Sequence, residues 1–143
     1  MTIYALSSGP GLSGVAVIRI SGPNSSKVLK LLTNHELPAP RVATLRKINN
    51  INTSELIDEG LILWFPGPQS YTGEDMAEFH VHGSKAVVKA MHTTISEIKG
   101  CRLADPGEFT KIAFQNGKIN LLKAESISAV SYTHLTLPTN DLV

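Results

Sequence analysis

The stretch YTGEDMAEFHVHG, residues 71–83, joins a glycine turn to a strand pattern and ends at a second glycine. Over residues 76–82 polar and apolar side chains alternate, which predicts a half-buried β-strand. Glu78, His80 and His82 then share one face of the strand, and the apolar residues between them form the other. We therefore expect a line of carboxylate and imidazole groups along one side of a sheet.

An amphipathic helix is predicted directly after this strand. Gly83 and Ser84 form a strand-to-helix corner, and apolar residues recur at helical spacing as far as Ile98. The polar face of the strand thus leads into the start of a helix, where backbone N–H groups are available to a bound ligand.

The remaining segments alternate between strand and helix signals without the regular order of a doubly wound fold. Asn24 or Ser25 can cap a helix that runs to Leu32. Strands are predicted at 3–6, 15–20, 42–48, 56–65 and 101–103; a hairpin connection at 8–14 joins the first two, and Asp105-Pro106-Gly107-Glu108 opens a further helix. This order favours an α+β fold, a two-layer sandwich of a mixed sheet and helices.

Composition limits the class of protein. With 143 residues and 42% hydrophobic content, the chain suffices for one compact domain and a fragment of a second. The net charge of +1 does not provide the excess of positive charge that nucleic-acid-binding proteins use to bind phosphates. Neither a membrane-spanning run nor an export signal is visible, so we expect a cytoplasmic protein. Cys101 is the single cysteine, which excludes an internal disulfide and suits a packed strand position.

The C-terminal part changes character in the middle of an element. Residues 121–128 have a helical pattern, whereas residues 131–140 switch to β-branched and aromatic residues and include a proline. We expect residues 131–143 to be foreign to the domain, either as a truncation scar or as an artefact of sequence assembly, and we leave them out of the fold argument.

The two histidines on the predicted strand allow a metal site as one interpretation. His80 and His82 are spaced to point the same way, and Glu78 would complete a triad of ligands. His35 lies in a proline-rich loop and His92 on an ordinary helix, so a second cluster of ligands is missing. Polar lining of a pocket or interface is therefore favoured over a metal, and no metal ligands are assigned.

Glu78 and Arg19 each place a charge in a strand otherwise suited to a core. Burial of either charge is costly unless a partner compensates it, so an ion pair between the two is the simplest structural interpretation. Lys118 follows a helix end at Asn116-Gly117, where most lysines are simply solvated. The glycine-rich segments lack the lysine and hydroxyl residue that a P-loop places after its glycines, so nucleotide hydrolysis by this chain is not expected.

Five runs together resemble one family. The chain from Ile3 to about Ser128 is similar, in the same order, to the N-terminal region of the MnmE (TrmE) family of tRNA uridine modification GTPases. The runs are GVAVIRISG (14–22), DEGLILWFPGP (58–68), SYTGEDMAE (70–78), PGEFTKIAF (106–114) and NGKINLLKAE (116–125).

The resemblance implies a fold, a ligand and partners. The N-terminal domain of the family resembles the folate-binding domains of aminomethyltransferases and dimethylglycine oxidases, binds a tetrahydrofolate derivative (5-formyl- or 5,10-methylene-tetrahydrofolate) and forms a homodimer. Arg19, Glu78 and Lys118 fall on the family's folate contacts; no catalytic residue is implied. The parent protein also uses GTP, Mg and K, and it acts with an MnmG-type flavoprotein on the wobble uridine of tRNA at C5.

The resemblance also implies a domain organisation. We expect a folate-binding and dimerisation domain at 1–118, the truncated start of a helical domain at 119–130, and the foreign tail at 131–143. Without GTPase motifs, such a chain would be inactive as an enzyme on its own. A eukaryotic relative would be mitochondrial. Two alternatives stay open: a folate-dependent aminomethyltransferase or oxidase acting on a small amine, and a dimerisation module without ligand.

Overall fold

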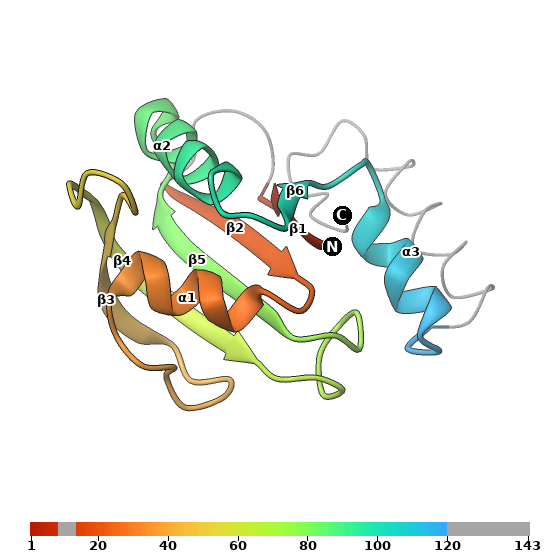
Figure 1. Cartoon of the computed structure of the whole chain (residues 1–143). Helices are drawn as coiled ribbons and strands as arrows, with labels where there is room; N and C mark the ends of the chain where they lie inside the picture. The colour runs from red at the N-terminus through yellow and green to blue at the C-terminus, as the bar shows by residue number, and fades with distance from the viewer. Residues whose placement is uncertain (9–13, 120–143) are drawn as a thin grey trace.

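The computed structural model describes residues 1–8 and 14–119, which form a six-stranded mixed sheet and three helices (Figure 1). The strands lie in the order β3-β4-β5-β2-β1-β6, and all neighbours are antiparallel except the parallel pair β1 and β6. The elements are β1 (Thr2–Leu6), β2 (Val15–Ser21), α1 (Ser25–Thr33), β3 (Thr44–Asn49), β4 (Leu56–Phe65), β5 (Met76–His82), α2 (Lys85–Ser96), β6 (Cys101–Leu103) and α3 (Glu108–Gln115). The α+β prediction is confirmed, as is the hairpin pairing of β1 with β2.

β5 lies between β4 and β2 in the interior of the sheet, as its alternating sequence predicts. Ala77 and Phe79 are fully buried, whereas Glu78 and His80 remain partly exposed on the opposite face. The period-2 pattern of this strand therefore divides the whole sheet into an inner apolar face and an outer polar face.

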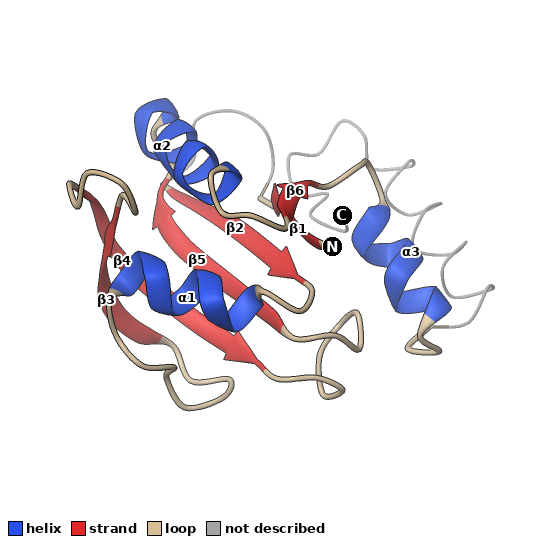
Figure 2. Ribbon diagram, in the orientation of Figure 1, coloured by secondary structure: helices blue, strands red, loops and turns tan. Residues whose placement is uncertain are grey.

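The main core lies between the inner face and helices α1 and α2, which cover the same side of the sheet (Figure 2). The helices contribute apolar side chains at helical spacing, among them Val28, Leu32, Met91 and Ile95, and all four are fully buried. These side chains pack on residues such as Ile18 and Phe79 of the sheet. Burial of this stripe provides most of the stability of the layer.

The two helix starts differ from each other. At α2 the side chain of Ser84 accepts a hydrogen bond from the backbone N–H of Val87, which is an ordinary N-cap. At α1 Asn24 is the N-cap residue, as expected, but it makes no side-chain cap hydrogen bond, and its amide nitrogen donates to the carbonyl of Lys99 instead. The Ser25 hydroxyl also serves a different purpose, since it donates to the carbonyls of Gly22 and Asp75.

Helix α3 stands apart from the other two helices and lies near β1 (Figure 1). Phe109 of α3 is buried in a second, smaller cluster with Ile3 and Met76. Ile3 and Met76 belong to the outer face, because their neighbours Tyr4 and Ala77 pack in the main core. The layer of α1 and α2 on the sheet matches the two-layer prediction, and α3 additionally covers one end of the outer face.

Some expectations fall on the C-terminal part of the chain. Apart from Ile119, the predicted helical-domain start (119–130) and the predicted foreign tail (131–143) lie outside the described residues. Within residues 1–8 and 14–119, no helix has the length and apolar character needed to cross a bilayer.

Candidate functional site

The candidate site is centred on Arg19 of β2 and Glu78 of β5, which are directly opposed in the antiparallel ladder. Nη2 of Arg19 lies 3.3 Å from Oε2 of Glu78, and Nε of Arg19 donates to the same oxygen at 3.3 Å. The side chains retain 20% and 17% of their exposure, so both ions are largely withdrawn from water. The ion pair expected from the sequence is confirmed, and it lies on the outer face of the sheet.

His80, the next residue on this face of β5, binds the other oxygen of the same carboxylate. Its Nε2 lies 2.9 Å from Oε1 of Glu78. Burial alone would raise the pKa of the Glu78 carboxyl, but the hydrogen bond from His80 and the charge of Arg19 outweigh it and hold the pKa below its ordinary value. Glu78 is therefore a fixed and ionised acceptor at neutral pH.

Two aromatic rings face the guanidinium of Arg19. The carbon Cζ of Arg19 lies 5.8 Å from the centre of the Tyr71 ring and 6.0 Å from the centre of the Phe109 ring. Both distances are in the range of cation–π attraction. The Tyr71 hydroxyl is 3.0 Å from Oγ1 of Thr110, so the segment before β5 and helix α3 are joined at the site.

The segment 66–75, which connects β4 to β5 and carries Tyr71, is held by polar contacts with β2 and with itself. The Ser21 hydroxyl lies 2.7 Å from that of Thr72 and donates to Glu74 at 2.8 Å. The backbone N–H of Gly67 donates to the Asp75 carboxylate at 2.8 Å. These contacts fix the position of Tyr71 relative to the sheet.

Lys118, the third predicted site residue, meets the same segment 66–75 and does not contact the ion pair directly. Its Nζ donates to the carbonyl of Pro68 at 2.8 Å. The side chain of Asn116 donates to the carbonyl of Thr72 at 2.8 Å and ties the end of α3 to this segment. The structure thus brings Arg19 and Glu78 into contact, and it places Lys118 against the neighbouring segment 66–75.

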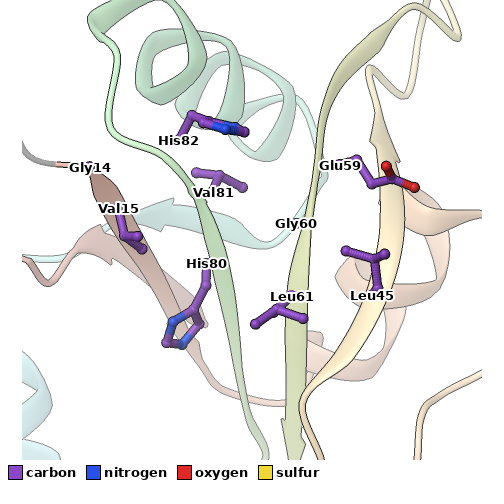
Figure 3. Close-up of a pocket in the computed structure, with 9 residues that line it drawn as sticks. All are labelled: Gly14, Val15, Leu45, Glu59, Gly60, Leu61, His80, Val81 and His82. Carbon is purple, nitrogen blue, oxygen red and sulfur yellow. The ribbon is translucent and has the colours of Figure 1, made fainter.

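A groove of about 300 Å³ lies on the outer face next to the ion pair (Figure 3). Val15, Leu45 and Leu61 project into it from three strands and are exposed. Its full lining is Gly14, Val15, Leu45, Glu59, Gly60, Leu61, His80, Val81 and His82. His80 belongs both to this lining and to the ion-pair cluster, so the groove and the Glu78 carboxylate form one continuous region of the sheet face.

His82 points to a different partner from His80. Its Nδ1 lies 2.9 Å from both carboxylate oxygens of Asp58 on β4, and its backbone N–H donates to Oδ2 at 2.8 Å. The two histidines therefore serve separate carboxylates. In the part of the chain that the structure describes, no group of three or more His, Cys, Asp or Glu side chains could hold a metal ion.

Sequence reasoning missed three contributors to the site: Tyr71, Phe109 and the groove. Tyr71 carried a usable signal, because it belongs to the same stretch as Glu78 and precedes the turn at Gly73. Phe109 lies on a separate helix, and its contact with Arg19 depends on which face of the sheet α3 covers. Local periodicity carries no information on that choice.

The fold and the site define an α+β domain with a largely buried acid–guanidinium pair on the outer face of its sheet. Residues 2–118 match the family described as GTP-binding protein TrmE N-terminus, and the chain therefore belongs to that family. The resemblance found in the sequence is confirmed.

Several curated relatives are similar over most of this chain. It is 78% identical over 128 residues to tRNA modification GTPase MnmE of Pelagibacter ubique, which covers 90% of this chain and 29% of the relative. It is 51% identical over 128 residues to the mitochondrial 5-taurinomethyluridine-tRNA synthase subunit GTPB3 of Homo sapiens, covering 89% of this chain and 26% of that protein. The chain thus spans less than a third of the length of these relatives.

Proposed function

We propose that this chain is the N-terminal, tetrahydrofolate-binding and dimerisation part of a GTPase that modifies the wobble uridine of tRNA at C5. The membership of residues 2–118 in the TrmE N-terminal family supports the assignment. The two relatives named above, a tRNA modification GTPase and a 5-taurinomethyluridine-tRNA synthase subunit, support the same activity for the parent protein.

One observation carries the ligand proposal: Glu78 is ionised, largely buried and fixed at both oxygens on the outer face of the sheet. A pterin ring presents an amino group and a ring N–H side by side, and a carboxylate accepts two such donors at once. The side chains present fit this group, because an anchoring acid needs to be held both charged and in a fixed orientation.

Arg19 and Lys118 are the proposed supporting contacts. Arg19 lies against Glu78 and suits a carbonyl oxygen of the ring, whereas Lys118 suits the anionic glutamate tail. Lys118 donates to the carbonyl of Pro68, a neutral acceptor that an anionic group can replace. The tetrahydrofolate derivative, 5-formyl- or 5,10-methylene-, supplies a one-carbon unit when bound.

The remaining parts of the proposal concern the parent protein. We assign residues 1–118 to the folate-binding domain, residues 119–130 to the start of a helical domain and residues 131–143 to the foreign tail. GTP, Mg and K would be bound outside this chain, which would be inactive alone. A homodimer, an MnmG-type flavoprotein and tRNA are the proposed partners, in the cytoplasm or, for a eukaryotic source, in mitochondria.

The direct test is calorimetric titration of 5-formyltetrahydrofolate into the chain and into its Glu78→Gln form. The variant keeps the shape of the side chain and removes its charge, so we expect affinity to fall by about tenfold or more, the amount expected for a lost charged hydrogen bond. Glu55→Gln changes an exposed glutamate before β4 and serves as the matched control. Equal affinity of the wild type and Glu78→Gln would remove the anchor role.

The same titration also tests the remaining alternative, a dimerisation module that binds no ligand. Such a module predicts no binding heat from the wild-type chain, while its oligomeric state in analytical ultracentrifugation stays dimeric. Binding heat that depends on Glu78 argues against it.

A further inference from the structure

The net charge of +1 averages over parts of the molecule that differ in sign. Helices α1 and α2 carry four lysines and no acid, with Lys27 and Lys30 on α1 and Lys85 and Lys89 on α2. Residues 56–82, which run from β4 to β5, contain five acids and no lysine or arginine. The positive charge is therefore concentrated on the two helices.

Both helices present their lysines on the same side of the molecule. α1 and α2 cover one side of the sheet (Figure 2), and their apolar stripes, which include Val28 and Met91, are buried in the main core. The four lysines are exposed, so they lie on the solvent-facing side of each helix.

The two helices are joined at one end, where a fifth lysine lies. The side chain of Asn24, before α1, donates to the carbonyl of Lys99, after α2, at 3.2 Å, and Lys99 is exposed. Burial raises the pKa of the Cys101 thiol, and the charge of Lys27 opposes this rise, so Lys27 also lies at this end. We call these five exposed cations the lysine layer: Lys27, Lys30, Lys85, Lys89 and Lys99.

The lysine layer keeps its charge available to an external anion. Among the residues that the structure describes, none of its five members forms an ion pair. Cations elsewhere are engaged, since Arg19 and Arg102 each meet a glutamate and Lys118 donates to a backbone carbonyl. The acid that precedes Lys99 in the sequence, Glu97, accepts a hydrogen bond from the side chain of Asn52.

The side chains around these lysines distinguish among anionic partners. A protein interface has an apolar or aromatic centre and is poor in lysine, and a membrane-surface helix turns its apolar stripe to the lipid. In α1 and α2, both described throughout, Leu31 is the one large apolar side chain that is exposed, and the apolar stripes face the core. The phosphates of a nucleic acid need only available cations and hydrogen-bond donors.

We propose that the lysine layer binds the phosphate backbone of tRNA, on the side of the sheet opposite the face that carries Arg19 and Glu78. The choice of RNA as the polyanion rests on the proposed function. Lysine is a flexible point charge, so these contacts follow the backbone and do not read the bases. The two sides of the sheet then serve different partners, a folate on the outer face and an RNA on the helices.

The test measures binding of the chain to a fluorescently labelled, unmodified tRNA transcript by anisotropy at several KCl concentrations. Two double variants, Lys27→Gln with Lys30→Gln and Lys85→Gln with Lys89→Gln, each remove two charges from the layer. We expect each to weaken binding at about 50 mM salt by at least about tenfold, and to flatten the slope of log K against log[salt] by about 1–2.

A matched double variant separates the layer from net charge. Lys47→Gln with Lys111→Gln removes the same charge from exposed positions on β3 and α3 and should weaken binding by less than about threefold. Lys27→Arg with Lys30→Arg keeps the charge and should bind as the wild type does. Equal losses in all three glutamine variants would mean that net charge alone sets the affinity, which would overturn the inference.

The remaining outcomes separate this inference from the folate proposal and from a membrane. Failure of 5-formyltetrahydrofolate to bind, with tRNA binding intact, would refute the folate proposal alone. Absence of tRNA binding by the wild type at about 50 mM salt would overturn the inference and leave the folate proposal standing. Sedimentation with phosphatidylserine vesicles, lost in the same double variants and without tRNA binding, would assign the layer to a membrane surface and overturn the inference as well.

Discussion

Arg19 and Glu78 face each other across β2 and β5, and their charged groups meet on the sheet face opposite the main core. An ion pair in this position has lost most of its hydration. Neighbouring groups must therefore compensate the free-energy cost of withdrawing the two charges from water. His80 and two aromatic rings provide that compensation here. The pair is thus held in place before any ligand arrives.

The decrease in the free energy of unfolding at acid pH is predicted to depend on Glu78. The pKa of this carboxyl is lowered from its ordinary 4.5 in the folded state, so the unfolded state binds a proton first as the pH falls. Its stabilising contribution is present above pH 4.5 and is lost as the pH falls through the lower folded pKa. Glu78→Gln should lose about 1–3 kcal/mol at pH 7 and show a flatter decline below pH 4.5 in urea unfolding. A decline as steep as that of the wild type would contradict this role.

Gly73 is predicted to resist substitution for two separate reasons. Its φ is +83°, and an added Cβ would lie 3.2 Å from Cβ of Asn116 and 3.4 Å from Cγ of Lys118. Gly73→Ala should therefore lose about 1–2 kcal/mol in the free energy of unfolding. Gly117→Ala, at φ +72° with open space around it, isolates the backbone strain, and Gly14→Ala, which has open space and no such φ, should be nearly neutral. Equal losses at Gly73 and Gly14 would argue against this explanation.

Two phenylalanines on α3 provide a matched pair. Phe109 is 1% exposed and packs on Ile3 and Met76, whereas Phe114 is 41% exposed. Phe109→Ala should cost about 3–5 kcal/mol because it leaves a cavity under α3. Phe114→Ala should change stability by less than about 0.5 kcal/mol. Thermal and urea unfolding would measure both, and similar losses from the two variants would mean that α3 does not dock through Phe109.

His92 is predicted to weaken the fold at mildly acidic pH. Burial lowers the pKa of its imidazole from 6.5, and Nε2 is buried without a hydrogen-bond partner among the described residues. The unfolded state therefore takes up a proton before the folded state does, and stability falls as the pH drops below 6.5. His92→Phe keeps a ring against Tyr4, which the imidazole meets edge-on at 5.5 Å. The difference in Tm between about pH 5 and pH 8 should be smaller in this variant than in the wild type. If the control variant His35→Gln, at an exposed position, reduced this difference by the same amount, the assignment to His92 would be refuted.

The local elements were predictable because their patterns are strong. The alternation from Met76 to His82 places three polar side chains on one face, and that division of faces holds through the sheet. The predicted strand at 42–48 begins two residues early, since Thr44 is the first residue that pairs with β4. Boundaries of this kind depend on ladder partners that lie elsewhere in the sequence.

The assembly of the site was less predictable. An ion pair between Arg19 and Glu78 follows from charge burial alone, but the rings of Tyr71 and Phe109 come from a connecting segment and from a separate helix. Equal spacing made His80 and His82 look like a pair, yet His80 contacts Glu78 of its own strand and His82 contacts Asp58 of β4. Tertiary contacts decide these partners, and local propensity does not record them.

The parallel pairing of β1 with β6 has a consequence for synthesis on the ribosome. Thr2 pairs with Cys101 and Tyr4 with Leu103, so β1 needs a strand that is synthesised much later to complete its hydrogen bonding. At the usual rate of about 5–20 residues per second, the nascent chain waits roughly 5–20 s for that partner. During this interval β1 presents an open edge that another polypeptide can join, and the growing chain is exposed to mispairing and to chaperones at this strand.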